Sequence, residues 1–229
     1  RTTTSDGRMV SSDMLLYAAG RIGATADLGL ENCGLEADSR GKLTVDVKSM
    51  QTEIPHIYAA GDVIGFPSLA STSMEQGRIA ACHAFGAPLP KNAEIFPFGI
   101  YAVPEISSVG LTEAAARAAG LQFEVGVARL RETSRGHIMG VGGGLLKMIF
   151  SLNNRRLLGV HIIGEGATEL IHIGQAVANL GGTIDYFIEH TFNYPTLAEA
   201  YKIAALDAWN RMPARIADAP AVQKLRKAA

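Results

Sequence analysis

The stretch Ile57-Tyr-Ala-Ala-Gly-Asp-Val63 combines an apolar run, a glycine and a carboxylate. Its first four residues are apolar or small, which predicts a short buried strand over residues 57–60. The strand would end at Gly61, where the missing side chain lets a ligand approach the backbone closely. Asp62 would then stand at the carboxyl end of the strand, the edge at which open α/β sheets bind ligands.

A helix is predicted over residues 70–85, directly after this stretch. Free backbone N–H groups at its start would favour an electron-rich ligand atom. The carboxylate could bind a ribose-like diol, and the start of the helix could bind a polarised carbonyl. A nucleotide cofactor has both groups. A buried strand, a capped turn and a helix, with Asp62 acting only as the cap, is an equally open interpretation. Three serines are expected as caps of this helix: Ser68, Ser71 and Ser73.

The overall composition is that of an ordinary globular protein. The 229 residues are 48% hydrophobic and 19% charged, with a net charge of −1, so there is no electrostatic attraction to nucleic acid or to anionic lipid. No apolar run reaches the length of a transmembrane helix. The two cysteines, Cys33 and Cys82, are too far apart in sequence for a metal-binding or redox motif, and no metal site is expected. We expect a cytoplasmic protein with reduced thiols.

The Pro-rich residues 86–92 are expected to mark the boundary between two regions of the chain. Before them, we expect strands over residues 8–10 and 14–19 and a connector with a short strand over 42–45. After them, strands are expected over 96–103, 106–109 and 123–130, and a helix from Thr112 to Gly120. A hairpin is expected over 145–164, with its strands joined by Asn153-Asn154-Arg155, because two asparagines tolerate the positive φ of a tight turn.

Further helices follow the hairpin. The first is predicted over residues 165–180, because Leu170, Ile173, Val177 and Leu180 form an apolar stripe at helical spacing. Thr183 is expected to cap a short helix, and Thr196 a longer one that ends near Trp209.

Three neighbouring segments resemble one known family. Residues 57–63, followed by Ser68-Leu-Ala-Ser71 and Met74-Glu-Gln-Gly-Arg78, resemble the second flavin-binding segment of the flavoprotein reductases that have two dinucleotide-binding domains. Dihydrolipoamide dehydrogenase and glutathione reductase belong to this family. The resemblance implies that the Gly61–Asp62 pair binds FAD, with Asp62 on the ribityl chain. It also implies isoalloxazine contacts from Ser68, Leu69, Ala70 and Ser71.

A second resemblance lies upstream. Ala19-Gly20-Arg21 resembles the motif that closes the NAD(P)-binding domain of the family, where the glycine lies against the nicotinamide nucleotide. Gly20 and Arg21 are therefore expected to contact NAD or NADP. The same three residues would also be found if Gly20 only connected a strand to a turn and bound no ligand.

The resemblance also sets the expected organisation. The chain starts at Arg1 and contains no G-x-G-x-x-G turn for a pyrophosphate. We therefore expect the carboxyl-terminal half of a larger enzyme, inactive by itself, with an α/β part followed by an α+β part. The expected parts are the end of the NAD(P) domain (1–22), the last piece of the FAD domain (23–95), an interface domain (96–212) and a tail (213–229).

The segment from His190 to Ala200 resembles the closing signature of the family. In the disulfide reductases a histidine precedes the proline and is oriented by a glutamate, and this pair moves protons for a dithiol. Here Pro195 and Glu199 are present, but Tyr194 stands at the histidine position. A phenol with a pKa near 10 is a poor base for a thiol. Hydride exchange between two nicotinamides releases no such proton, so a tyrosine would be tolerated there. The resemblance of this segment, in the form with Tyr194, therefore implies hydride transfer from NADPH to NAD through FAD, with Tyr194 and Glu199 at the site.

Two alternatives stay open at this point. One is another reductase of the family, either of the dihydrolipoamide dehydrogenase type or a metal-ion reductase. A disulfide reductase would carry a C-x-x-x-x-C pair in the amino-terminal half. The other is a dimerisation module without catalysis. The family resemblance implies a homodimer formed through the carboxyl-terminal domain, with small-molecule nucleotide substrates and no nucleic-acid or membrane partner.

Overall fold

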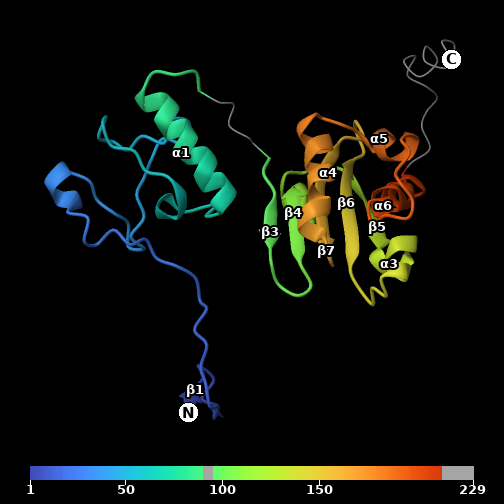
Figure 1. Cartoon of the computed structure of the whole chain (residues 1–229), viewed down its shortest axis with the longest axis horizontal. Helices are drawn as coiled ribbons and strands as arrows, with labels where there is room; N and C mark the ends of the chain where they lie inside the picture. Colours follow the sequence, from blue (N-terminus) through green and yellow to red (C-terminus); the bar gives the residue numbers. More distant parts are fainter. Residues whose placement is uncertain (90–94, 213–229) are drawn as a thin grey trace. The chain divides into compact units, whose positions relative to one another are not determined.

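A computed structural model describes residues 1–89 and 95–212. The chain divides into two compact units, Arg1–Asn92 and Ala93–Ala229, and each is described by itself (Figure 1). The predicted tail, 213–229, and part of the Pro-rich segment lie outside the described residues.

The first unit contains little regular structure besides one long helix. It has a small antiparallel hairpin, β1 (Thr2–Thr3) and β2 (Met9–Val10), and then two 3-10 turns, η1 (Leu30–Cys33) and η2 (Gly61–Ile64). The helix is α1 (Ala70–Ala84), which agrees with the predicted 70–85 within one residue. In Figure 1 it is the teal helix above a set of loops.

The strand predicted over residues 14–19 is wrong. This stretch is extended without strand pairing, and its side chains are exposed, with Met14 at 86% and Leu16 at 85%. A strand requires ladder hydrogen bonds to a neighbour, and none of the described residues supplies a ladder for it. A run of apolar residues was therefore not sufficient to predict a strand here.

The strand predicted over 57–60 is also wrong, as is the one over 42–45. Residue Tyr58 forms only an isolated bridge with Gln51. The flanking contacts are single backbone bonds, from the Ala59 N–H to the Met50 carbonyl (3.1 Å) and from the Thr52 N–H to the Ile57 carbonyl (2.9 Å). The apolar residues 57–60 thus lie in a loop that is joined to a neighbouring loop by a few backbone hydrogen bonds and leads into η2.

The serines expected to cap α1 do not do so. Leu69 is the N-cap, and no side chain caps the helix. The Ser68 hydroxyl donates to the Gly65 carbonyl (2.6 Å) and the Ser73 hydroxyl to the Leu69 carbonyl (2.8 Å). A serine hydroxyl can bond a carbonyl three or four residues back instead of an amide ahead of it. The start of the helix therefore keeps its amides uncapped by side chains.

The second unit is an antiparallel sheet with helices, which confirms the predicted α+β arrangement. Its strand order is β3-β4-β7-β6-β5, visible in Figure 1 as the green to yellow strands. The hairpin of β6 and β7 is confirmed, but Arg155 adopts the positive φ (60°), not the two asparagines before it. The strands are β3 (Phe98–Ile100), β4 (Ile106–Gly110), β5 (Phe123–Arg129), β6 (Leu145–Ser151) and β7 (Leu157–Ile163).

Two long helices pack against this sheet. Helix α4 (Ala167–Asn179) contacts β4 and β7, and α6 (Glu199–Trp209) contacts β5 and β6. Shorter helices connect them. These are α2 (Glu113–Ala118), η3 (Leu130–Glu132), α3 (Ser134–Ile138) and α5 (Ile184–Glu189).

The predicted details of these helices are partly confirmed. Thr112 caps α2, accepting from the Ala115 N–H (3.1 Å). In the predicted apolar stripe of α4, Val177 is buried and Leu170 and Ile173 pack partly buried against the core. Leu180 is wrong, because it is 87% exposed, and the buried Ile171 was left out of the stripe. Thr183 and Thr196 make no side-chain cap, since their hydroxyls bond Oδ2 of Asp185 and the carbonyl of Asn193.

One buried tyrosine joins the two long helices. The Tyr201 hydroxyl accepts from the Gly174 N–H (3.1 Å) and donates to the Leu170 carbonyl (2.7 Å), both in α4. Its ring stacks on Phe187 with centroids 5.3 Å apart. Burial raises the pKa of Tyr201. This contact fixes α6, and therefore Glu199 at its first position, against the rest of the domain.

Within the described ranges, every helix is too short or too polar to cross a lipid bilayer.

Candidate functional site

The Gly61–Asp62 turn is held against α1 by a side chain that the sequence interpretation missed. The Gly61 N–H donates to Oε1 of Gln76 (2.8 Å). Gly61 itself has φ of 85°, and a Cβ there would lie 3.3 Å from the Ser73 hydroxyl. The motif Met74-Glu-Gln-Gly-Arg78 contains Gln76, but a motif match alone does not reveal which atom it contacts.

The side chains predicted to contact FAD lie open to solvent around this turn. Asp62, Ser68, Ala70 and Ser71 are exposed and Leu69 is half-buried. An exposed carboxylate beside a helix start without a side-chain cap can bind hydroxyl groups and an electron-rich carbonyl. The small side chains at the first two helical positions leave room for a flat ring. These residues fit the ribityl chain and ring of a flavin.

Arg21 reaches the same turn. Its Nε lies 3.7 Å from Oδ2 of Asp62, and the two side chains are 86% and 51% exposed. An ion pair this exposed contributes little stability. Gly20, with φ of 98°, has open space where a Cβ would lie. The structure therefore brings Arg21 to Asp62.

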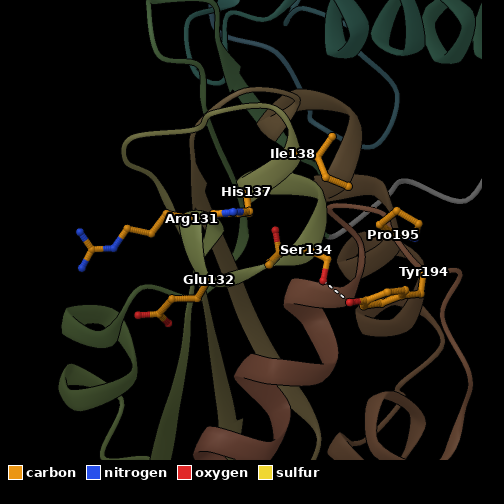
Figure 2. Close-up of a pocket in the computed structure, with 8 residues that line it drawn as sticks. Arg131, Glu132, Ser134, His137, Ile138, Tyr194 and Pro195 are labelled. Atoms are coloured by element: carbon orange, nitrogen blue, oxygen red, sulfur yellow. Dashed lines mark hydrogen bonds between the residues drawn. The ribbon is translucent and has the colours of Figure 1, made fainter.

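The two residues predicted from the closing signature meet at a third residue, Ser134. The Tyr194 and Ser134 hydroxyls form a hydrogen bond, drawn as a dashed line in Figure 2. The Ser134 N–H donates to Oε1 of Glu199 (2.9 Å). Glu199 Oε2 is buried and has no hydrogen-bond partner in the described part of the chain. Tyr194 and Glu199 are thus brought together through Ser134, without a direct bond between them among the described residues.

Ser134 was missed because no local pattern marks it. It is the first residue of α3, which Thr133 caps by accepting from the Gly136 N–H (3.0 Å). Its partners lie 60 and 65 residues further along the chain. Only the packing of α3 beside the start of α6 creates the contact.

A pocket of about 530 Å³ surrounds this contact. Arg131 and Glu132 line it, yet Figure 2 shows them pointing away from the hydrogen bond between Ser134 and Tyr194. Glu132 pairs with Arg129 (3.3 Å). The phenol therefore has a neutral hydroxyl, not a charged group, as its polar contact. The lining residues are Arg131, Glu132, Thr133, Ser134, His137, Ile138, Tyr194 and Pro195.

Across residues 1–89 and 95–212, no group of three or more His, Cys, Asp or Glu residues could hold a metal ion.

Comparison with known proteins identifies the class. Residues 96–205 match the dimerisation domain of the pyridine nucleotide-disulphide oxidoreductases, and residues 1–77 match the pyridine nucleotide-disulphide oxidoreductase model. The chain belongs to the pyridine nucleotide-disulphide oxidoreductase family, and the resemblance drawn from its motifs is confirmed.

Individual relatives carry more specific names than the family. A "Soluble pyridine nucleotide transhydrogenase" of Mycobacterium bovis is 52% identical over 213 residues, covering 93% of this chain and 45% of the relative. A protein of the same name from Salmonella paratyphi B is 50% identical over 210 residues, covering 90% and 45%. The chain spans about half the length of these relatives.

Solved structures agree at the level of the fold. The crystal structure of LpdA from Mycobacterium tuberculosis matches with a TM-score of 0.80 and 28% identity, over 89% of this chain and 44% of that one. The HOCl-induced flavoprotein disulfide reductase RclA from Escherichia coli matches with 0.76 and 28%, over 82% and 44%.

Proposed function

We propose that this chain is part of an FAD-dependent flavoprotein that transfers hydride from NADPH to NAD. The observation that supports the proposal best is the neutral contact of Tyr194 with Ser134. A dithiol reductase needs a base of near-neutral pKa at this position, because only a thiolate is nucleophilic. A phenol bonded to a hydroxyl is no such base. Hydride exchange, NADPH + NAD⁺ giving NADP⁺ + NADH, has no net proton to remove. The names of the relatives support the same activity.

The residues of the first unit would hold the cofactors. FAD, when bound, supplies a two-electron acceptor between the two nucleotides. Asp62 would bind the ribityl hydroxyls, and the segment Ser68-Leu-Ala-Ser71, together with the amides at the start of α1, would face the ring. Gly20 and Arg21 would lie toward the nicotinamide nucleotide, and the contact of Arg21 with Asp62, which would bind the ribityl chain, supports this.

The organisation of the protein follows from the same proposal. Residues 1–22 would end the NAD(P) domain, 23–95 would complete the FAD domain, 96–212 would form the interface domain and 213–229 a tail. The family match over 96–205 supports a homodimer formed through that domain. The relatives are named as soluble enzymes and both cysteines are free, so we place the protein in the cytoplasm.

Tyr194→Phe should lower the rate of transhydrogenation by less than tenfold, which is about 1.4 kcal/mol. The phenol would contribute one neutral hydrogen bond, worth roughly 0.5–1.5 kcal/mol net. Glu199→Gln should be similarly mild, because a glutamine keeps an oxygen to accept from the Ser134 N–H. The measurement is the steady-state reduction of an NAD analogue by NADPH, for the flavoprotein and both variants. A loss of several hundredfold in Tyr194→Phe would show that the phenol transfers a proton.

A further inference from the structure

One residue contacts both side chains of the closing signature, from a different element of the fold. The Ser134 hydroxyl bonds the Tyr194 hydroxyl, and the Ser134 N–H donates to Glu199 Oε1 (2.9 Å). Each contact uses a different atom of Ser134, so the two can be removed separately. A change of side chain affects only the bond to Tyr194.

Ser134 is itself firmly held. The Thr133 hydroxyl donates to the Leu130 carbonyl (2.7 Å) while accepting from the Gly136 N–H (3.0 Å), so that the turn into α3 is bonded on both sides. Gly136 packs so closely that a Cβ would lie 1.9 Å from the Leu130 carbonyl oxygen. On the other side, Tyr201 anchors α6 and so fixes the backbone of Glu199.

Tyr194, in contrast, has little else to fix it. Its side chain is 74% exposed, and the Ser134 hydroxyl is the single polar partner of its phenol among the described residues. A tyrosine this exposed would otherwise sample several rotamers. Glu199 makes no hydrogen bond to the phenol among the described residues, since its Oε1 accepts from the Ser134 N–H and its Oε2 has no partner.

We propose that Ser134 is a positioning residue, which fixes the Tyr194 phenol as a wall of the reaction site. Glu199 would orient the phenol only indirectly, by fixing the backbone of Ser134. The inference rests on the proposed function in so far as Tyr194 faces the reacting nucleotides. It assigns α3, rather than the closing signature alone, the role of setting the geometry there.

The test uses the flavoprotein labelled with ¹³C at Cζ of tyrosine, with Tyr194→Phe to assign the Tyr194 resonance. Ser134→Ala should shift this resonance toward that of a solvated tyrosine, and Ser134→Thr, which keeps a hydroxyl, should restore it. Arg135→Ala, an exposed change in the same helix, is the matched control and should leave the resonance unchanged. An unchanged Tyr194 resonance in Ser134→Ala would refute the positioning role.

A kinetic cycle provides a second measurement. Ser134→Ala should lower kcat by about two- to tenfold, the range expected for one hydrogen bond, and should add nothing in the Tyr194→Phe background. An equal loss in both backgrounds would contradict the proposal. If the flavoprotein exchanges no hydride between nucleotides, the proposed function is wrong, while the Cζ resonance still decides whether Ser134 holds Tyr194.

Discussion

Gly126→Ala should lower the free energy of unfolding of the second unit by at least about 3 kcal/mol. Gly126 lies in β5 directly beneath α6, and a Cβ there would lie 1.8 Å from the Ala204 carbonyl oxygen and 2.9 Å from the Ala208 Cβ. The nearest atoms are backbone, so no side-chain rotation can relieve the overlap. The strand and the helix would have to separate, which opens the core at Ala204 and Ala208, both fully buried.

Urea denaturation followed by circular dichroism measures this change. The matched control is Gly142→Ala, because nothing lies within 4 Å of a Cβ at Gly142. That variant should have an unchanged midpoint or a slightly higher one, through the lower entropy of its unfolded chain. Equal midpoints for the two variants would contradict the close packing of β5 against α6. The displacement should also reach the site, because α6 begins at Glu199.

Tyr201→Phe should destabilise the same unit by about 1–3 kcal/mol. The substitution keeps the ring stacked on Phe187 and removes only the hydroxyl. It thereby deprives the Gly174 N–H and the Leu170 carbonyl of the buried group that bonds both. The loss would be at the lower end of this range if α4 closes its own hydrogen bond between these two groups.

Tyr186→Phe is the control for this prediction, since Tyr186 is 39% exposed and lies on the neighbouring helix α5. It should change the denaturation midpoint by an amount within about ±0.5 kcal/mol, as exposed substitutions usually do. A Tyr201→Phe variant as stable as Tyr186→Phe would mean that the bridge between α4 and α6 contributes nothing.

The sequence predicts the second unit well because its elements are specified locally. The hairpin of β6 and β7 and the helix α4 have strong periodic patterns, and Thr112 directly precedes the helix that it caps. The positive φ at Arg155 and the exposure of Leu180 were missed, since both depend on how neighbouring elements pack. A local sequence pattern predicts that a helix or strand exists more reliably than it predicts which of its side chains are buried.

The structure of the first unit and the contact at Ser134 could not be predicted from local patterns in the sequence. An apolar run such as residues 14–19 predicts a strand only if another strand lies beside it, and none of the described residues provides one. Gln76 and Ser134 act through contacts 15 and 60 residues away in sequence. Such contacts are set by the assembled fold, and no spacing rule within the chain indicates them.

In the function proposed above, the flavoprotein containing this chain would exchange hydride between nicotinamides and would not reduce disulfides. The most direct test compares initial rates of NADPH oxidation with an NAD analogue and with a small disulfide as acceptor, at equal concentrations. We expect turnover of the NAD analogue in the ordinary enzymatic range of about 1–10³ s⁻¹. Reduction of the disulfide should be slower by about a hundredfold or more, the usual contribution of a general base that Tyr194 cannot supply. Reduction of the disulfide as fast as reduction of the NAD analogue would contradict the account.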